Sequence, residues 1–373
     1  MSKRKRRIIV AVTNDLFTDQ RVHKVCTFLE QLGWDVLLVG RKLKHSQPIQ
    51  RSYATHRMKL FFTKGALFYA FFNLRLFFFL LVRPCEAILS NDLDTLLACY
   101  CAKRFKKKCD IIYDSHELFT EVPELVSRPR VQKIWLWIEQ AIFPKLKKVY
   151  TVNNSIAAIY RGKYMVNVRV VRNVSPIWKP QIIRSREELN LPNDRFIIVL
   201  QGAGINIDRG AEEAMEAMKY IQSDALFLII GDGDVIPQLK EKVQLENLEK
   251  SVKFLGKMSY QEMMNYTHHA DLGLSLDKST NSNYLFSLPN KIFDYIHTST
   301  PILASDLIEV KKVVEQHNVG RIVSSHNPKE IASHIDAILG DKLLLESLKN
   351  NCKEAAKVEN WEQEIVKVLD YFD

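Results

Sequence analysis

Residues 286–306 read FSLPNKIFDYIHTSTPILASD, and this stretch predicts a loop, a short helix and a strand in that order. Pro289 suits the start of a helix, and apolar residues then recur at helical spacing. Residues 301–305 form a short apolar run that fits a strand. Asn290 and Lys291 stand at the expected helix N-terminus, where unpaired backbone N–H groups favour an anion. The stretch fits a phosphate-binding unit or an ordinary helix–strand pair with a polar loop.

The rest of the chain repeats this alternation of short apolar runs and helical patterns. It predicts an α/β protein with two Rossmann-like, doubly wound domains that face each other across a cleft. Residues 173–180, NVSPIWKP, are typical of a linker between the two. The expected strands are residues 8–12, 35–40, 87–90, 110–113, 148–152, 168–171, 196–200, 225–230, 252–255, 272–276, 301–305 and 320–323.

The net charge of +10 is divided unevenly between the two halves. Residues 1–175 hold 31 Lys and Arg against 13 Asp and Glu, whereas the remainder holds 22 against 30. A basic half joined to an acidic half indicates two domains with different partners. The basic half suits nucleic acid, anionic lipid or a phosphorylated substrate, and a surface bias that only aids solubility remains the alternative.

Residues 60–82, LFFTKGALFYAFFNLRLFFFLLV, are the most apolar part of the chain. Residues 66–82 are near the lower length limit for a membrane span, but Arg75 at the centre of a span would be costly. Three interpretations remain open. The segment is a helix packed within the domain, a helix with one face on a bilayer surface, or a transmembrane span.

The N-terminus carries no apparent signal peptide, because the apolar run after its basic residues covers only residues 8–12. The six cysteines form no CxxC pair, and the histidines are not spaced as zinc ligands. We therefore expect reduced thiols, no bound metal and a cytoplasmic protein, which the basic half can hold at the inner face of a membrane.

Several blocks, in this order, resemble one family. The first part holds TDQRVHK at residues 18–24 and YDSHE at residues 113–117. The second part holds QG and RG at 201–202 and 209–210, IGDGD at 230–234, FLG at 254–256, ADLGLS at 270–275, and PNKIFDY and TPILASD within the opening stretch. Together they resemble the family 4 glycosyltransferases over nearly the whole chain. Each block is weak alone, and their order and spacing carry the resemblance.

The resemblance implies a GT-B fold and a retaining transfer of a sugar from a nucleotide-sugar donor, with no bound metal or cofactor. It implies an acceptor-side domain at residues 1–175, a donor-binding domain at residues 176–355, and a C-terminal helix at residues 356–373 that crosses back to the first domain. The acceptor would be a saccharide or a lipid-linked precursor in cell-surface polysaccharide synthesis. No nucleic-acid partner is expected, since no recognition motif for DNA or RNA is present.

The catalytic candidates are His116, Arg209 and Lys291. A fixed cation at Arg209 can stabilise the charge that develops on a departing diphosphate, and Lys291 is the second candidate cation. His116 follows an expected strand, where ligands gather in open α/β sheets, and the family places a histidine near the donor sugar. The acceptor-binding candidates are Arg21, for which an internal salt bridge is the alternative, and Glu117.

The donor-binding candidates lie in the turn after residues 196–200, after FLG, and in the opening stretch. Asp294 matches a glutamate that takes the ribose hydroxyls in relatives, but it is one carbon shorter. Relatives carry a second glutamate where this chain has Phe286, so Ser287 and the backbone near Leu288 are the expected substitutes. The full set is Gly202, Gly204, Met258, Ser287, Leu288, Asn290 and Asp294.

Other functions remain open. Gly202 and Gly204 form half of a dinucleotide fingerprint, but the third glycine is missing at the required spacing, which disfavours a dehydrogenase. Asp92 and Asp94 form a DxD, the metal-binding pattern of another glycosyltransferase fold, yet so short a pattern is common by chance. A nucleotide-sugar epimerase of the same fold and a non-catalytic module that binds a membrane or nucleic acid are the alternatives.

Overall fold

The computed structural model describes residues 5–17, 19–180 and 182–373. The chain divides into two compact units. The first runs to Asn173 and also takes in Ile365–Asp373, and the second is Val174–Glu364. The sequence predicted the division at residue 175 and a C-terminal segment, residues 356–373, that returns to the first domain. The structure groups only the last nine residues of that segment with the first unit.

The first unit is built on a seven-stranded parallel sheet with the order β3-β2-β1-β4-β5-β6-β7. The order turns at β1, which pairs with β2 on one side and β4 on the other. The carboxyl ends of β1 and β4 thus lie side by side, where open α/β sheets bind ligands. The strands are β1 (Arg7–Asp15), β2 (Asp35–Lys42), β3 (Ala54–Lys59), β4 (Ala87–Asn91), β5 (Asp110–Ser115), β6 (Lys148–Thr151) and β7 (Val168–Val170).

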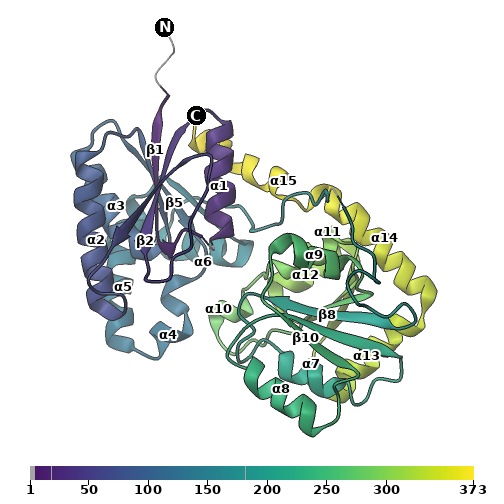
Figure 1. The fold of residues 1–373 in the computed structure, drawn as a ribbon. Coiled ribbons are helices and arrows are strands. Elements are labelled where there is room, and N and C mark those ends of the chain that lie inside the picture. The colour runs from purple at the N-terminus through teal and green to yellow at the C-terminus, as the bar shows by residue number, and fades with distance from the viewer. Residues whose placement is uncertain (1–4, 18, 181) are drawn as a thin grey trace. The chain divides into compact units, whose positions relative to one another are not determined.

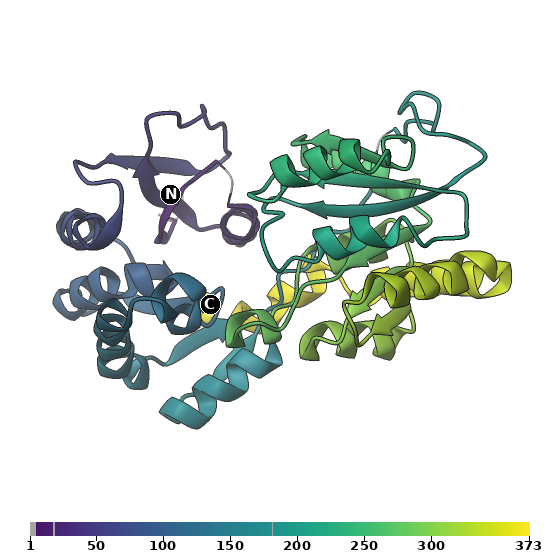
Figure 2. The same ribbon diagram turned by 90° about the horizontal axis from the view of Figure 1, so that it is seen from below.

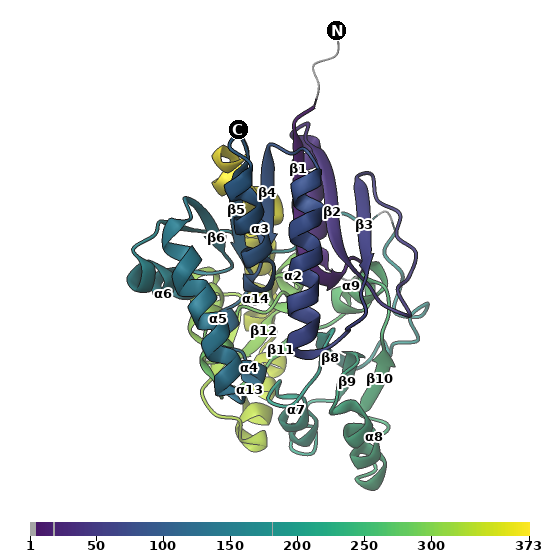
Figure 3. The same ribbon diagram turned by 90° about the vertical axis from the view of Figure 1, so that its left-hand side faces the viewer.

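Helices cover both faces of this sheet (Figures 1 and 3). One apolar core joins α2 and α3 to the sheet, and α1 buries Val22, Val25 and Leu29 on the other side. The helices are α1 (Gln20–Gln31), α2 (Gly65–Val82), α3 (Leu93–Phe105), α4 (Pro123–Val126), α5 (Pro129–Ile142) and α6 (Asn154–Tyr164), with short 3₁₀ turns at Phe119–Glu121, Phe143–Lys145 and Val366–Tyr371.

The second unit has a six-stranded parallel sheet with the order β10-β9-β8-β11-β12-β13. Its chain order turns at β8, which pairs with β9 and β11. The strands are β8 (Phe196–Gly202), β9 (Ala225–Gly231), β10 (Val252–Gly256), β11 (Leu272–Ser275), β12 (Ile302–Ser305) and β13 (Gly320–Val323).

Two apolar cores, one on each face of this sheet, hold its helices (Figure 2). Residues of α7, α8 and α13 belong to one core, and residues of α11 and α12 belong to the other. The helices are α7 (Ala211–Ala217), α8 (Ile236–Leu245), α9 (Tyr260–His268), α10 (Ser282–Leu285), α11 (Lys291–His297), α12 (Ile308–His317), α13 (Pro328–Gly340), α14 (Lys342–Val358) and α15 (Trp361–Ile365).

Two all-parallel sheets with helices on both faces confirm the predicted pair of Rossmann-like domains. Local chemistry sets several helix starts: Asn153 caps α6 by accepting a hydrogen bond from the Ile156 amide, and Asp19 caps α1 by accepting one from the Val22 amide. After the turn at residues 201–204, the sequence pattern predicts a helix that runs to about Tyr220, but α7 covers only Ala211–Ala217. Gly210 has φ +75° at its start, and a β-carbon there would lie 2.2 Å from the Leu276 carbonyl oxygen.

Candidate active site

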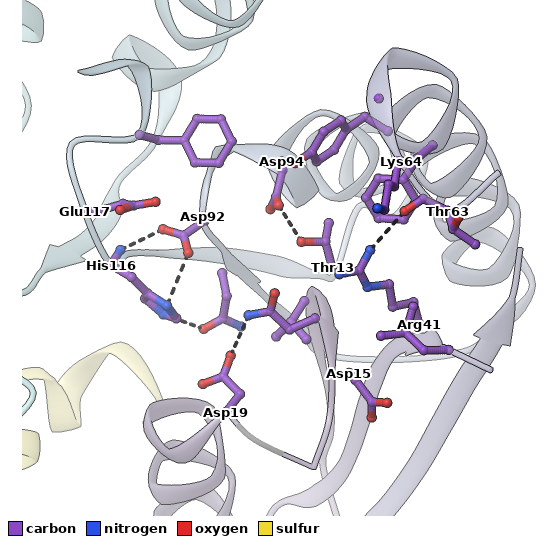
Figure 4. Close-up of a pocket in the computed structure, with 18 of the residues that line it drawn as sticks. Thr13, Asp15, Asp19, Arg41, Thr63, Lys64, Asp92, Asp94, His116 and Glu117 are labelled. Atoms are coloured by element: carbon purple, nitrogen blue, oxygen red, sulfur yellow. Dashed lines mark hydrogen bonds and ion pairs between the residues drawn. The ribbon is translucent and has the colours of Figure 1, made fainter. Parts of the chain in front are cut away.

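A cavity of about 800 Å³ opens at the carboxyl edge of the first unit's sheet (Figure 4). Its walls come from the loops after β1 and β2, the N-terminus of α2, and the ends of β4 and β5. Its lining includes carboxylates, two histidines, cations and three aromatic side chains. The residues used below are Thr13, Arg41, Lys64, Asn91, Asp92, Asp94, His116 and Glu117.

His116 follows β5 directly, and both of its ring nitrogens have partners. Nδ1 lies 3.2 Å from Asp92 Oδ2, and Nε2 lies 3.2 Å from both Asp114 Oδ2 and Asn91 Oδ1. The His116 amide also donates to Asp92 Oδ1 at 2.7 Å. Burial lowers the pKa of His116, but Asp92 and Asp114 outweigh burial and raise it to about 9. The ring is therefore held in one orientation and carries a proton near pH 7.

Two carboxyl groups beside this ring bind protons more tightly than usual. Burial raises the pKa of Asp92 to about 8, although the charge of His116 acts in the opposite direction. Burial also raises the pKa of Asp94 to about 7, against a hydrogen bond donated by Thr13. Asp92 adopts a φ of +56°, which is uncommon for a residue with a side chain. The cavity thus has groups able to exchange protons near neutral pH.

Arg21 and Glu117, the acceptor-binding candidates, take different places. Glu117 lines the cavity beside His116 (Figure 4). The Arg21 side chain is 4% exposed, and its Nε and Nη2 donate to the two oxygens of Asp114 at 3.0 and 2.7 Å. Its Nη1 donates to the Val171 carbonyl. This is the internal salt bridge that the sequence left open, and it holds the carboxylate that in turn contacts His116.

The Arg21 guanidinium decides the charge of Asp114. Burial raises the pKa of this carboxyl, but Arg21 and His116 outweigh burial and lower the pKa to about 2. Asp114 is therefore ionised at any ordinary pH, unlike the neighbouring Asp92. One strongly ionised carboxylate and one that titrates near neutrality contact opposite edges of the same imidazole.

In the second unit, two of the candidate cations share one buried carboxylate. Arg209 Nη1 lies 2.7 Å from Asp277 Oδ1, and Lys291 Nζ lies 3.2 Å from Asp277 Oδ2. The Asp277 side chain is 0% exposed, whereas Arg209 and Lys291 are 30% and 12% exposed. The guanidinium also stacks on the Tyr284 ring at 4.4 Å. The cluster has one positive charge in excess, fixed near the carboxyl ends of β8 and β11.

Two polar atoms near this cluster have no hydrogen-bond partner among the residues that the structure describes. They are Arg209 Nε and Ser287 Oγ, both buried. Because a buried polar atom without a partner is costly, each is a candidate to bind a ligand. Ser287 is the residue that the sequence offered beside Phe286, in place of the glutamate of relatives.

The other donor-binding candidates surround the same strand ends or lie under them. Gly202 ends β8, and a β-carbon on Gly231 would meet its carbonyl oxygen at 1.9 Å, so these two turns are in close contact. Gly204 follows in the loop. Met258 and Leu288 are partly buried against the core of the second unit, and Asn290 stands before α11 without a side-chain cap.

Asp294 is buried and already hydrogen-bonded. Tyr260 Oη donates to its Oδ1 at 2.8 Å, Ser175 Oγ donates to the same atom at 2.5 Å, and Gln201 Nε2 donates to Oδ2 at 3.1 Å. A direct contact between Asp294 and a ribose hydroxyl would therefore replace at least one of these hydrogen bonds. Its role as a ribose ligand stays a prediction.

Comparison with protein families decides the identity of the chain. The model of the glycosyl transferases group 1 matches residues 181–358, and that of glycosyltransferase family 4 matches residues 19–174. The chain belongs to the family 4, or group 1, glycosyltransferases. The two matches divide the glycosyltransferase between its two units, as the resemblance of the sequence blocks predicted.

Curated relatives of this glycosyltransferase are distant. It is 20% identical over 247 residues to an uncharacterized glycosyltransferase of Methanocaldococcus jannaschii, across 60% of this chain and 68% of that one. It is 25% identical to the alpha-D-kanosaminyltransferase of Streptomyces kanamyceticus, across 44% and 42% of the two chains. It is 24% identical to the amylovoran biosynthesis glycosyltransferase AmsK of Erwinia amylovora, across 37% and 33%. The last two matches span less than half of those relatives.

Solved structures support the fold over the full length. The sucrose-phosphate synthase of Thermosynechococcus elongatus matches with a TM-score of 0.79 and 19% identity, across 98% of this chain and 97% of that one. HepE of Anabaena, solved in complex with UDP-glucose, matches with a TM-score of 0.73 and 14% identity, across 98% of both chains. These likenesses confirm the predicted GT-B fold of the glycosyltransferase.

The sequence missed Asp277 and the part played by Asp92. Asp277 directly follows an apolar strand, where open α/β sheets bind ligands, so its position in the sequence could have marked it as a candidate site residue. Its contact with Lys291 depends on the fold, because Asp277 lies in the loop after β11 and Lys291 begins α11. The DxD pattern at Asp92 and Asp94 was considered only as a metal site. Among the described residues, no group of three or more His, Cys, Asp or Glu side chains is arranged to hold a metal ion.

Proposed function

We propose that this glycosyltransferase is a retaining, metal-independent hexosyltransferase. It transfers a sugar from a nucleotide-sugar donor to a saccharide or a lipid-linked acceptor in cell-surface polysaccharide synthesis. The observation that carries the donor assignment is the cluster of Arg209 and Lys291 around the buried Asp277, with the unpaired Arg209 Nε beside it. Retention and independence of metal rest on the family to which the chain belongs.

The cluster suits a leaving nucleoside diphosphate. When the bond between the sugar and the diphosphate breaks, its electron pair stays on the phosphate oxygen, where negative charge grows. Arg209 and Lys291 are already fixed by Asp277, so they need little reorganisation to stabilise that charge. Asp277 neutralises only one of the two cations, and the remaining positive charge favours an anion over a neutral ligand.

The polar end of the first unit's cavity suits the hydroxyl groups of an acceptor. Asp94 and Glu117 line it and can accept hydrogen bonds from sugar hydroxyls. His116 is protonated and donates toward Asp92 and Asp114, so it fixes the arrangement of the carboxyl groups around it. A proton released by an attacking hydroxyl can be taken up in this cavity, because Asp94 has a pKa of about 7.

The cellular setting is part of the proposal. AmsK, a relative by sequence, is named for the biosynthesis of amylovoran, which supports a role in polysaccharide synthesis. We place the protein in the cytoplasm, at the inner face of a membrane, with the basic first unit toward anionic lipid. No cofactor beyond the donor is required, and nucleic acid is not a partner.

Thermal shift with a ligand panel tests the donor assignment. The panel holds UDP, GDP and ADP, their common sugar conjugates, and NAD(P). A ligand that binds only the folded state raises stability by about 2.7 kcal/mol at 100 times its Kd. We expect a shift with one nucleoside diphosphate and its sugar, reduced in Arg209→Ala and in Ser287→Ala. As a control, Ser325→Ala changes a serine outside this cluster and should keep the full shift.

Turnover separates this function from its alternatives. We expect transfer to continue in excess EDTA, and the product to keep the anomeric configuration of the donor in a proton NMR spectrum. A shift with NAD(P) alone would indicate a dehydrogenase instead. Conversion of the donor without an acceptor would indicate an epimerase, and the lack of any shift would favour a binding module.

A further inference from the structure

Helix α2 is apolar on nearly all sides, with Asn73 and Arg75 as its polar side chains besides Tyr69, yet only one side of it is covered. Its inner face, Phe68, Phe72, Leu76 and Leu80, is fully buried against the sheet and α3. Its outer face leaves large apolar side chains in contact with solvent: Leu67 is 61% exposed, Leu74 53%, Phe78 57% and Val82 79%. A surface helix of a soluble domain normally carries polar residues on that side. The outer face of α2 is therefore a surface that lacks a partner within its unit.

Neighbouring segments widen this apolar surface. Phe61 is 86% exposed, and its ring contacts Phe71 of α2 at 5.7 Å. Phe105, at the end of α3, is 72% exposed and contacts Phe77 of α2 at 6.0 Å. Figure 3 shows α2 and α3 side by side on the outside of the sheet. We call Phe61, Leu67, Leu74, Phe78, Val82 and Phe105 the outer patch.

Cations lie on and directly beside the outer patch. Residues 36–85 contain nine Lys and Arg and no Asp or Glu. Arg75 is exposed on α2 itself, and Lys106, Lys107 and Lys108 follow Phe105 directly. Cations around an apolar patch are complementary to an anionic bilayer, in which phosphate groups lie above the acyl chains.

We propose that the outer patch docks on the surface of an anionic lipid bilayer, with the helix parallel to the membrane plane. This goes further than the membrane partner of the proposed function because it names the face that makes the contact. Among the described residues, α2 is the one helix that is long and apolar enough to cross a membrane. Crossing would pull its inner face from the sheet core, and would carry Arg75 and the internally bonded Asn73 into lipid.

A second copy of the chain fits this patch less well. A symmetric dimer would place the same surface on both sides of the interface. The exposed Arg75, and Lys107 and Lys108 after Phe105, would then lie at one interface with the same cations of the other copy. A bilayer that contains anionic lipid offers an apolar layer and negative charge together.

Docking in this orientation would matter for the acceptor, and this point alone rests on the proposed function. The residues at the N-terminus of α2, Thr63, Lys64 and Gly65, line the cavity that holds His116 (Figure 4). Arg41 reaches the Thr63 carbonyl from the neighbouring strand. The outer patch would thus bring one rim of that cavity to the level of the headgroups, where a lipid-linked acceptor presents its phosphate and sugar.

Vesicle sedimentation of the full chain tests the docking surface. The vesicles are phosphatidylcholine alone, or phosphatidylcholine with phosphatidylglycerol. Leu74→Ser with Phe78→Ser should lower partition into the anionic vesicles about tenfold or more. Lys107→Glu with Lys108→Glu should lower it to a similar degree. The matched controls lie in the second unit: Leu245→Ser with Leu343→Ser changes exposed leucines, and Lys353→Glu with Lys357→Glu changes exposed lysines.

Three outcomes would overturn the proposal. One is equal binding of the wild type and both patch variants, each with an unchanged far-UV spectrum. Another is equal binding to neutral and anionic vesicles. The third is a concentration-dependent dimer, measured by sedimentation without lipid, that Leu74→Ser with Phe78→Ser abolishes while no vesicle binding occurs. Donor is absent from these assays, so their failure would leave the thermal-shift result for the nucleotide intact.

Discussion

Replacing Asp277 with asparagine should destabilise the second unit strongly, because one carboxylate holds two cations there. The Asp277 side chain is fully buried, and its oxygens lie 2.7 and 3.2 Å from Arg209 and Lys291. Removing one partner of a buried ion pair costs about 3–5 kcal/mol. Since both cations keep some exposure, we expect the lower end, about 3 kcal/mol, which lowers Tm by about 6–12 °C for a unit of this size.

Urea unfolding followed by circular dichroism at pH 7 measures this loss. Asp306→Asn is the matched control, because it removes a carboxylate from an exposed pair with Lys311 in the same unit. That change should cost less than about 1 kcal/mol. A free energy of unfolding for Asp277→Asn within about 0.5 kcal/mol of wild type would refute the reasoning, since the two cations would then not depend on this carboxylate.

The pH dependence gives the same prediction an independent test. Burial raises the pKa of Asp277, but Lys291 and Arg209 outweigh burial and hold it below its ordinary value of 3.8. The ionised carboxylate therefore stabilises the folded state above pH 3.8, and this contribution is lost as pH falls through the lower folded-state pKa. The gap between wild type and Asp277→Asn should be constant near neutrality and should close in acid. Pyrophosphate should raise the Tm of the variant more than that of wild type, because it supplies the missing negative charge.

Three further substitutions test the two sites. Arg209→Ala should lower turnover about 10²–10³-fold, and should affect the reaction more than it affects folding. Unchanged turnover would show that Arg209 takes no part in the reaction. His116→Ala should keep the thermal shift with nucleotide and reduce transfer, and wild-type transfer rates would contradict its assignment. Asp114→Asn should lower the urea midpoint of the first unit by the equivalent of about 3 kcal/mol, because Arg21 would stay buried without its counter-charge. A midpoint equal to that of wild type would show that Arg21 finds another partner.

Most strands could be predicted from the sequence because buried parallel strands are nearly continuous apolar runs. The strand at Ala54–Lys59 was missed because it is an edge strand whose residues, ATHRMK, are mostly polar. The helix before Tyr220 was predicted too long, since residues 203–209 form a loop that packs against neighbouring strand ends. Both errors arise where tertiary contacts outweigh local preference.

The candidate site could be predicted in its parts but not in its connections. Sequence blocks pointed to His116, Arg209 and Lys291. They could not show that Asp277 joins the two cations, or that Arg21 pairs with Asp114, a residue 93 positions away. Asp294 is a similar case, because it accepts a hydrogen bond from Ser175, which lies 119 positions earlier in the chain. Such pairs depend on the strand order, which brings distant loops to one edge of a sheet.

The sequence by itself determined the alternation of strands and helices, the helix starts at Asp19 and Asn153, and the apolar composition of α2. These follow from side-chain chemistry over a few neighbouring residues. The tertiary structure alone decided which face of α2 is buried, and which carboxyl groups near His116 keep their protons. Both depend on what packs around a side chain. Burial removes water from a carboxylate and raises its pKa, whereas a neighbouring cation stabilises the charge and lowers the pKa. The pKa of Asp92 is therefore raised and that of Asp114 is lowered, although both are aspartates.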